Sequence, residues 1–204
     1  MKYCYNKQKG FTIIETMISI SLFLVIVVIG MNALLNANVV QQKSQDMRSI
    51  LDNLSFIMED MSKNLRTGYK YHCYTGSVLI PADPNASDVA PLSCVSGWGV
   101  LFEPATGSTS NNSDQWIYYI SSGKIWKATQ GPYSNPPNFV QLNLDEIVLD
   151  STSGFSVLGA EAPTGNNQQP LANIRLSGKI NYKNVQTSFA LQTSVSQRLV
   201  DVLP

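Results

Sequence analysis

A single acidic side chain, Glu15, lies inside a long apolar stretch near the N-terminus. The stretch runs over residues 11–35, and the next charged residue after Glu15 is Lys43. A carboxylate within a membrane helix costs about 2.5–3.5 kcal/mol on insertion scales, so it usually marks a function and has a partner. From residue chemistry two interpretations stay open. Either Glu15 has a functional role and a partner within the apolar layer, or its carboxylate extends from the helix end to the lipid headgroups.

The three cysteines divide by position. Cys4 lies among the basic residues of the N-terminus, whereas Cys73 and Cys94 lie in the polar, turn-rich part of the chain. If a leader containing Cys4 is removed, an even pair remains, which suits a disulfide in an oxidising compartment. Such a bridge would stabilise the fold by about 3 kcal/mol in the chain-entropy model. Two free thiols that never meet are the alternative.

Few other residues could support catalysis or hold a metal. His72 is the only histidine, and it adjoins Cys73. Neighbouring residues on a strand point to opposite faces, so these two are not expected to form a nucleophile pair. The polar turns 83–88 and 108–114 could supply oxygen ligands to Ca²⁺, but neither has the ligand spacing of a known calcium loop. No phosphate-binding loop is present, and neither an enzyme nor a cofactor is expected.

The charge of the chain is distributed unevenly along its length. The 14 basic and 14 acidic residues give a net charge of zero. Three lysines crowd the first nine positions, which leaves 11 basic and 14 acidic residues from Phe11 onward. A mildly acidic body argues against a general electrostatic interaction with nucleic acid, which requires a basic face.

The apolar stretch is long enough to cross a bilayer as a helix. Residues 16–35 would span about 30 Å, the thickness of the hydrocarbon core. Lys2, Lys7 and Lys9 precede the stretch, so the positive-inside rule places the N-terminus in the cytoplasm and the rest outside. A cleaved secretory signal peptide is the competing interpretation. It is disfavoured because the apolar run is long and no small-residue cleavage site follows it.

The residues around Glu15 carry a family resemblance. Residues 9–15 read KGFTIIE: a basic residue, a glycine, and a Phe-led apolar run with glutamate at its fifth place. This pattern, with its basic leader and apolar helix, resembles the signature of type IV prepilins. The resemblance implies that a prepilin peptidase cuts between Gly10 and Phe11 and that the new Phe11 amine is methylated. Thr12 also fits the family pattern.

The resemblance gives Glu15 an expected role and the chain its expected partners. The carboxylate would be neutralised by the Phe11 amine of a neighbouring subunit, and only a complete pair is favourable in low dielectric. Glu15 is therefore expected to act in assembly. The implied partners are other pilin or pseudopilin subunits, the prepilin peptidase and methyltransferase, the inner-membrane assembly platform, and membrane lipid before assembly.

The pattern beyond the membrane span predicts one long helix and four segments. No proline occurs before Pro81, so the helix could run from about Phe11 to Arg66 and stop at Gly68. Steps of three and four place apolar residues on one helix face that would pack on the head. Many pilins loosen this helix in the filament, so melting near residues 30–36 is a hypothesis. The expected segments are a cleaved leader (1–10), a transmembrane and assembly helix (11–36), an amphipathic helix continuing into the head (37–68), and an exported β-rich head (69–204). The apolar face is expected to comprise Met47, Ile50, Leu51, Leu54, Ile57, Met58, Met61 and Leu65.

Short strands joined by turns predict an antiparallel sheet laid against the helical stripe, which is an α+β, pilin-like architecture. Two hairpins are expected, one around the turn 122–123 and one around 183–184. The aromatic side chains of the head are expected to lie in the core or in cross-strand pairs and not to form an adhesive surface. The strand candidates are Gln115–Ser121, Lys124–Ala128, Val140–Leu149, Phe155–Leu158, Ile174–Tyr182 and Thr187–Val195.

The expected function is a structural subunit of a type IV pilus or a type II secretion pseudopilus. The segments 48–68 and 189–198 resemble minor pilins and J-type pseudopilins, with a major pilin as a further option. The protein would lie in the cytoplasmic membrane as a single-pass protein and then in a cell-surface or periplasmic filament. The alternatives are an uncleaved, membrane-anchored extracellular binding domain and a surface enzyme. The sequence names no ligand for the head, neither DNA nor a secreted substrate.

Overall fold

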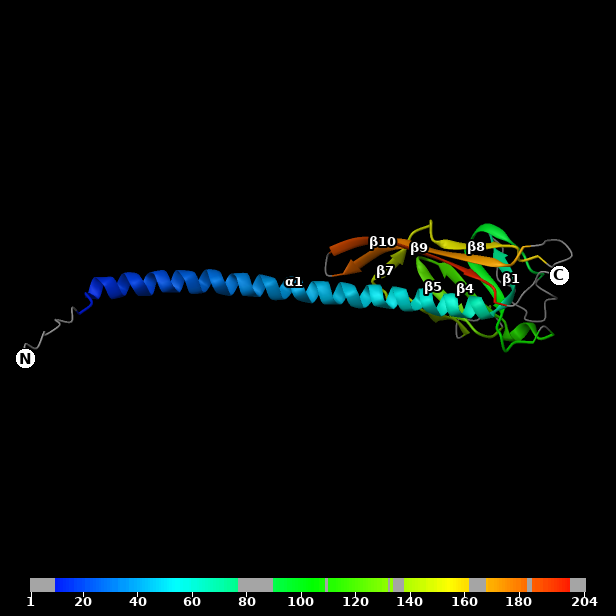
Figure 1. The fold of residues 1–204 in the computed structure, drawn as a ribbon, viewed down its shortest axis with the longest axis horizontal. Coiled ribbons are helices and arrows are strands. Elements are labelled where there is room, and N and C mark those ends of the chain that lie inside the picture. The colour runs from blue at the N-terminus through cyan, green and yellow to red at the C-terminus, as the bar shows by residue number, and fades with distance from the viewer. Residues whose placement is uncertain are drawn as a thin grey trace, which may run out of the picture. The chain divides into compact units, whose positions relative to one another are not determined.

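The computed structural model describes residues 10–76, 90–108, 110–131, 133, 138–161, 168–182 and 185–198. One long α-helix is followed by antiparallel β-sheets, so the chain has the expected α+β, pilin-like fold (Figure 1). The chain divides into two compact units, Met1–Ser49 and Ile50–Pro204. The second unit, called the head below, contains the last turns of the helix and all the strands of the described residues.

The helix α1 spans Ile13–Thr67, within two residues of the predicted bounds. It is continuous through Gly30 in the single chain, and the melting hypothesis, which concerns the filament, stays a prediction. The helix ends where expected, with the Gly68 N–H donating to the Asn64 carbonyl at 2.9 Å. Gly68 suits this stop because a Cβ there would overlap the side chain of Phe102. A larger residue would push the helix end away from the sheet.

The predicted apolar face of the helix is confirmed where the helix belongs to the head. Six of its residues are buried, and Leu54, Met61 and Leu65 have no exposed surface. Met47 is half-buried and Leu51 is 39% exposed, so these two lie at the margin of the face. Burying the six side chains stabilises the head by roughly 1.5–3 kcal/mol for each one fully removed from water. The buried residues are Ile50, Leu54, Ile57, Met58, Met61 and Leu65.

The first sheet has the strand order β1-β3-β4-β5-β6, all antiparallel. Its β4–β5 hairpin confirms the predicted turn: Ser122 and Gly123 have φ angles of 53° and 72°, as a two-residue turn with positive φ at both positions requires. Aromatic side chains stack across neighbouring strands here, as expected. The strands are β1 (Tyr69–Tyr74), β3 (Gly99–Glu103), β4 (Trp116–Ser121), β5 (Lys124–Ala128) and β6 (Val140–Gln141).

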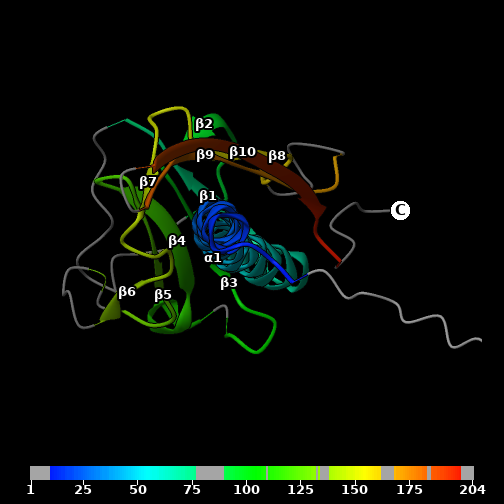
Figure 2. The ribbon, with the colours of Figure 1, turned by 90° about the vertical axis from the view of Figure 1, so that its left-hand side faces the viewer.

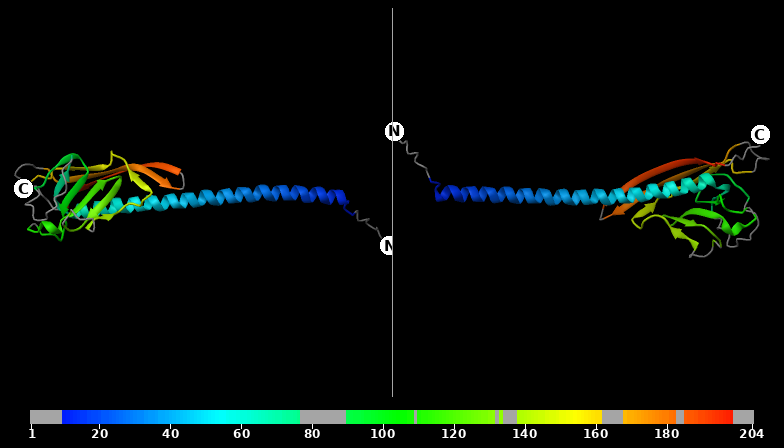
Figure 3. Two further views of the ribbon diagram at one scale, coloured as in Figure 1. Left: turned by 180° about the vertical axis from the view of Figure 1, so that it is seen from behind. Right: turned by 60° about the horizontal axis from the view of Figure 1, so that its bottom comes forward.

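The second sheet has the order β10-β9-β8-β2, and β7 also pairs with β9. The predicted β9–β10 hairpin is confirmed. The two strands pair without a break from Tyr182 opposite Val185 to Leu171 opposite Ser196, and the turn 183–184 lies outside the described residues. Figures 2 and 3 show the two sheets as separate layers, with the head portion of α1 (cyan) between them. The strands are β2 (Cys94–Gly97), β7 (Ile147–Leu149), β8 (Gly154–Leu158), β9 (Leu171–Tyr182) and β10 (Val185–Ser196).

Two sequence predictions about the sheets are wrong. The strands form two sheets rather than one, and the candidate strand Val140–Leu149 is split between them as β6 and β7. The buried side chain of Asn143 explains the break. Its Oδ1 accepts the Ile125 N–H at 2.8 Å and its Nδ2 donates to the Ile147 carbonyl at 3.0 Å. These bonds replace the backbone ladder, so the chain can turn from one sheet to the other.

A polar network ties the helix to the first sheet. The Lys127 ammonium lies 2.9 Å from the Asp60 carboxylate, and the Tyr118 hydroxyl donates to the same carboxylate at 2.8 Å. The Asn64 amide donates to both Asp60 and Tyr118. Burial would raise the pKa of Asp60, but the hydrogen bonds from Lys127 and Tyr118 hold that pKa below its ordinary value. The network therefore orients the charged side chains rather than leaving them unpaired in the core.

Candidate functional site

The Gly10–Phe11 junction lies outside the helix and is open to solvent. Both residues precede the first helical residue, Ile13, and the Phe11 side chain is 81% exposed. A Cβ built on Gly10 would have no atom within 4 Å. A protease that binds its substrate in an extended form can therefore reach this peptide bond without first unwinding the helix. This accessibility is the property that cleavage at the junction requires.

Thr12 caps the helix, a role that the sequence analysis missed. The Thr12 hydroxyl accepts the Glu15 N–H at 3.4 Å, and the Thr12 carbonyl accepts the Thr16 N–H at 3.2 Å. The Thr-x-x-Glu spacing is the signal that would have indicated this cap. The carboxylate of Glu15 lies in the first helical turn, where the positive end of the helix dipole favours an anion. The cap thus fixes the start of the helix directly after the junction.

Three side-chain hydroxyls in the apolar part of α1 are hydrogen-bonded within the helix. The hydroxyls of Thr16, Ser19 and Ser21 each donate to a carbonyl three or four residues earlier, at 2.8 Å. The apolar side chains of this part are not buried in the structure, and by length and composition the helix could cross a membrane. Exposed apolar side chains with internally bonded hydroxyls suit a lipid or protein environment, since neither supplies water to the backbone.

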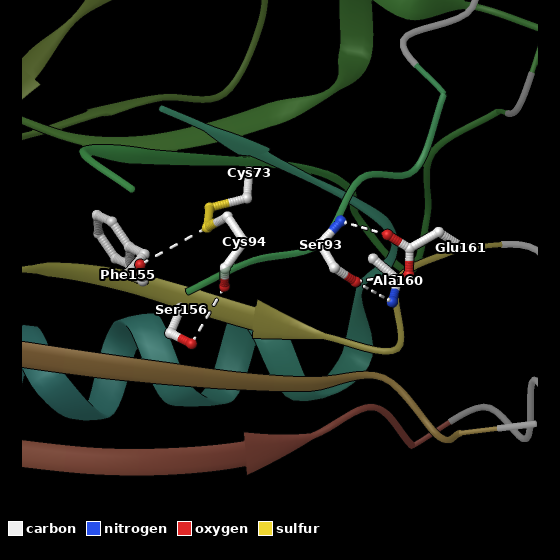
Figure 4. Close-up of a disulfide and its surroundings, with 7 residues drawn as sticks. All are labelled: Cys73, Ser93, Cys94, Phe155, Ser156, Ala160 and Glu161. Atoms are coloured by element: carbon white, nitrogen blue, oxygen red, sulfur yellow. Dashed lines mark hydrogen bonds between the residues drawn. A yellow bond between two sulfur atoms is a disulfide. The ribbon is translucent and has the colours of Figure 1, made fainter. Parts of the chain in front are cut away.

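The structure joins Cys73 and Cys94 by a disulfide, with their Cα atoms 5.8 Å apart. Because Cys73 lies in β1 and Cys94 in β2, the bond connects the two sheets. A Cβ on Gly97 would overlap the Cys73 sulfur, so this position needs glycine. Figure 4 shows the surroundings, where the Ser156 hydroxyl donates to the Cys94 carbonyl at 3.2 Å. The pairing that the cysteine count suggested is therefore the one in the fold.

Ser93 and Glu161 form hydrogen bonds next to the strand β2, which carries Cys94. The Glu161 carboxylate accepts the Ser93 N–H at 2.8 Å and the Ser93 hydroxyl at 2.6 Å, and that hydroxyl accepts the Ala160 N–H at 3.0 Å (Figure 4). The hydrogen bonds from Ser93 keep the pKa of Glu161 below its ordinary value. The ionised carboxylate thus links the chain before β2 to the chain after β8.

The other candidates from the sequence form no reactive group within the described residues. Cys73 is in the disulfide and cannot act as a thiol nucleophile, while the His72 Nδ1 lies 2.7 Å from the Ala90 carbonyl. In the turn 108–114, the Asp114 carboxylate accepts the Ser108 N–H at 2.9 Å. Within the described ranges no three acidic, histidine or cysteine side chains gather as metal ligands would. The turn 83–88 lies outside the described residues.

Glu103 is a buried carboxyl group at the end of β3, only 1% exposed. Burial raises the pKa of Glu103 from its ordinary 4.5 to about 7; the amide of Gln115 acts against this rise and the nearby Asp114 adds to it. In the part of the chain that the structure describes, its Oε1 has no hydrogen-bond partner. A neutral carboxyl is therefore favoured in the fold at mildly acidic pH, and folding takes up a proton between about pH 4.5 and 7.

Glu103→Gln is expected to stabilise the head at alkaline pH and to leave it nearly unchanged at pH 4.5. Because the folded pKa is raised, the wild type loses stability as pH rises through 7, whereas glutamine stays neutral. A loss on the order of 2 kcal/mol corresponds to roughly 4–8 °C in Tm. Thermal unfolding of the full chain in detergent, followed by circular dichroism from pH 4.5 to 8, measures the difference.

Glu161→Gln is the matched control, since the pKa of Glu161 is lowered and the pH dependence should reverse. The wild type should exceed this variant in Tm at pH 7, and the advantage should shrink toward pH 4. Parallel pH curves for wild type and Glu103→Gln would contradict the assigned burial of a neutral carboxyl.

Comparison with protein families identifies the N-terminal site. Residues 5–31 match the family model described as the prokaryotic N-terminal methylation motif. The chain carries a type IV prepilin-like leader. With its long apolar helix and antiparallel sheets, it fits the pilin and pseudopilin family. Searches of curated proteins and of solved structures each found no match.

The prepilin-like motif covers the junction, the cap and Glu15 in one short segment. Such a motif belongs to structural subunits that a peptidase processes and that assemble with other pilins, and it agrees with anchoring of the apolar helix in a membrane. The match ends at residue 31 and includes no part of the head of this prepilin-like chain.

Proposed function

We propose that this protein is a structural subunit, a minor pilin or J-type pseudopilin, of a type IV pilus or a type II secretion pseudopilus. Prepilin peptidase cuts it between Gly10 and Phe11, and the new Phe11 amine is methylated. The apolar helix then assembles with other subunits, and Glu15 pairs with the N-terminal amine of a neighbour. The observation that supports this most strongly is the exposed, non-helical junction directly before a capped helix, inside the methylation motif.

Before assembly the subunit lies in the inner membrane. The lysines of the leader favour an N-terminus in the cytoplasm, and the disulfide of the head fits an oxidising compartment outside. There the peptidase, the methyltransferase and the assembly platform meet the helix. After assembly the side chains that faced lipid contact other helices, and the subunit is part of a periplasmic or cell-surface filament.

Pairing of Glu15 explains why an acid is retained in an apolar helix. In low dielectric an unpaired carboxylate is strongly penalised, whereas a complete ion pair is tolerated. Removal of residues 1–10 creates a cationic amine on Phe11, only a few residues before Glu15. A neighbour shifted along the filament axis can present this amine to Glu15, and the pair then sets the register between the two helices.

Mass spectrometry of the protein purified from its own cells tests the proposal. The expected mature chain begins at Phe11 and carries one added methyl group. Gly10→Val should retain the leader in most molecules, because a β-branched side chain hinders the extended backbone in a protease cleft. An intact Met1 in wild-type cells would instead support an uncleaved, membrane-anchored binding domain.

Gly30→Val is the matched control for the junction. At both glycines the position that a Cβ would occupy has no atom within 4 Å, so neither change creates a clash. Gly30 lies within the helix, far along the chain from the junction, and its variant should be processed like the wild type. Equal loss of processing in both variants would show that the helix rather than the junction had been disturbed.

A further inference from the structure

A groove of about 440 Å³ lies in the head between the last turns of α1 and the strand β10. Every residue that lines it belongs to the compact unit Ile50–Pro204. In Figures 2 and 3 the red end of β10 comes alongside the cyan turns of the helix. We call this feature the strand groove. It is lined by Glu59, Ser62, Lys63, Arg66 and Thr67 of the helix and by Thr193, Ser194, Val195 and Ser196 of β10.

The strand groove meets the edge of β10 rather than one of its faces. Side chains of successive residues in a strand point to opposite faces, yet four successive residues of β10 line the groove. β10 is also the outermost strand of its sheet: it pairs with β9 on one side and with no other described strand. The groove therefore runs along an unpaired row of backbone N–H and C=O groups.

Two backbone hydrogen bonds show which groups point into the groove. The Gln197 N–H donates to the Pro170 carbonyl at 3.0 Å, toward β9, whereas the Arg198 N–H donates to the Arg66 carbonyl at 2.8 Å, toward the helix. Backbone N–H and C=O groups alternate in direction along a strand. Those of the odd-numbered residue Gln197 point toward β9, so those of even-numbered residues point away from it. Ser194 and Ser196 thus present their N–H and C=O groups to the groove, and the Arg198–Arg66 bond closes one end.

The edge lacks the features that usually prevent strand addition. β10 contains no charged residue and no proline over its length. In natural edge strands, residues of these two kinds commonly prevent pairing with another chain. The groove carries more basic than acidic residues. Lys63 and Arg66 line it, and Arg198 adjoins Arg66 at the closed end, whereas Glu59, one turn before Lys63, is the only acidic residue in the lining. Neither Lys63 nor Arg66 joins an ion pair among the described residues.

We propose that the strand groove binds an extended, carboxylate-bearing segment of a partner protein by β-strand addition. The segment adds as a further strand beside β10, bonding to the outward backbone groups of Ser194 and Ser196. Its carboxylate lies toward Arg66 at the closed end and toward Lys63 about one helical turn before it, while the main-chain bonds supply sequence-independent affinity. The proposal concerns the head alone, so it can fail without affecting the proposed processing of the N-terminus.

Binding of a defined peptide to the full chain in detergent micelles tests this. The probe is a fluorescein-labelled TVTVD peptide with a free carboxyl end, followed by fluorescence anisotropy. Ser196→Pro should weaken binding at least about tenfold, because proline removes an outward N–H and is tolerated at the open side of an edge strand. Lys63→Gln with Arg66→Gln should weaken TVTVD binding and spare an amidated TVTVN peptide.

Ser188→Pro is the matched control. Ser188 also has an even number, so its N–H points away from β9, but it lies about 26 Å along β10 from Ser196, outside the groove. This variant should bind the peptide like the wild type. Unfolding curves of both proline variants confirm that the β9–β10 ladder is intact. Three results would overturn the proposal: no saturable binding of TVTVD, equal weakening by both proline changes, or binding that appears only after deletion of residues 199–204, which would make the chain's own tail the occupant.

Discussion

Glu15→Val is expected to enter the membrane and lose its leader normally, yet to reach no more than about one tenth of the wild-type level in filaments. The valine removes a charge from an apolar helix, so insertion itself should not suffer. It also removes the proposed partner of the neighbouring N-terminal amine, and a tenfold loss corresponds to about 1.4 kcal/mol of docking free energy. Quantitative immunoblots of sheared filaments and membranes measure the ratio.

Ser19→Ala provides the control for Glu15→Val. Ser19 lies one turn farther along, and its hydroxyl donates to the Glu15 carbonyl at 2.8 Å, so the change is local and removes no charge. Its incorporation should match the wild type. If Glu15→Val were incorporated as well as Ser19→Ala, charge pairing could not set the register of the subunits, and Glu15 would simply be a carboxylate at the headgroup level.

The second large effect is expected from removing the disulfide with Cys73→Ala and Cys94→Ala together. The bond closes a loop between positions 21 residues apart, so its loss should cost about 3 kcal/mol, or roughly 6–12 °C in Tm. Both sheets should be destabilised, because Cys73 lies in one sheet and Cys94 in the other. Thermal unfolding of the full chain, with and without a reducing agent, gives the measurement.

Cys4→Ala is the corresponding control, because Cys4 lies in the leader and is absent from a processed chain. Its Tm should equal that of the wild type. Reducing agent should lower the Tm of the wild type and of Cys4→Ala, and should have no effect on the double variant. A double variant within about 2 °C of the wild type would mean that the bridge does not stabilise the head.

Local patterns predicted the elements whose structure depends on neighbours in sequence. The helical stripe follows from steps of three and four, and the Ser122–Gly123 hairpin from its turn residues. The N-terminal site also follows from local sequence, since Gly10, Phe11 and Glu15 all lie within one short motif. Even there, the capping bond of Thr12 was visible as a spacing but was not predicted.

Long-range partners account for what the sequence did not reveal. The division into two sheets depends on Asn143, whose side chain satisfies backbone groups of two strands that the sequence places 18 and 4 residues away. The strand β1 (Tyr69–Tyr74) lacks a clear alternation, and it forms because β3 pairs with it. The strand groove is equally non-local, because the outward edge of β10 matters only when the helix end lies beside it.

The order of the strands along the chain has a consequence for the proposed export of the head. All strands of the first sheet fall between residues 69 and 141, and both cysteines precede residue 95, whereas β7, β8 and β10 all bond to the late strand β9. If the residues next to the membrane helix emerge first, pairings between residues close in sequence can form first, because closing small loops costs least entropy. We expect oxidation of Cys73 and Cys94 to precede completion of the second sheet, which forms only when β9 and β10 have emerged. Thiol trapping of chains arrested before residue 171 would reveal the early bridge.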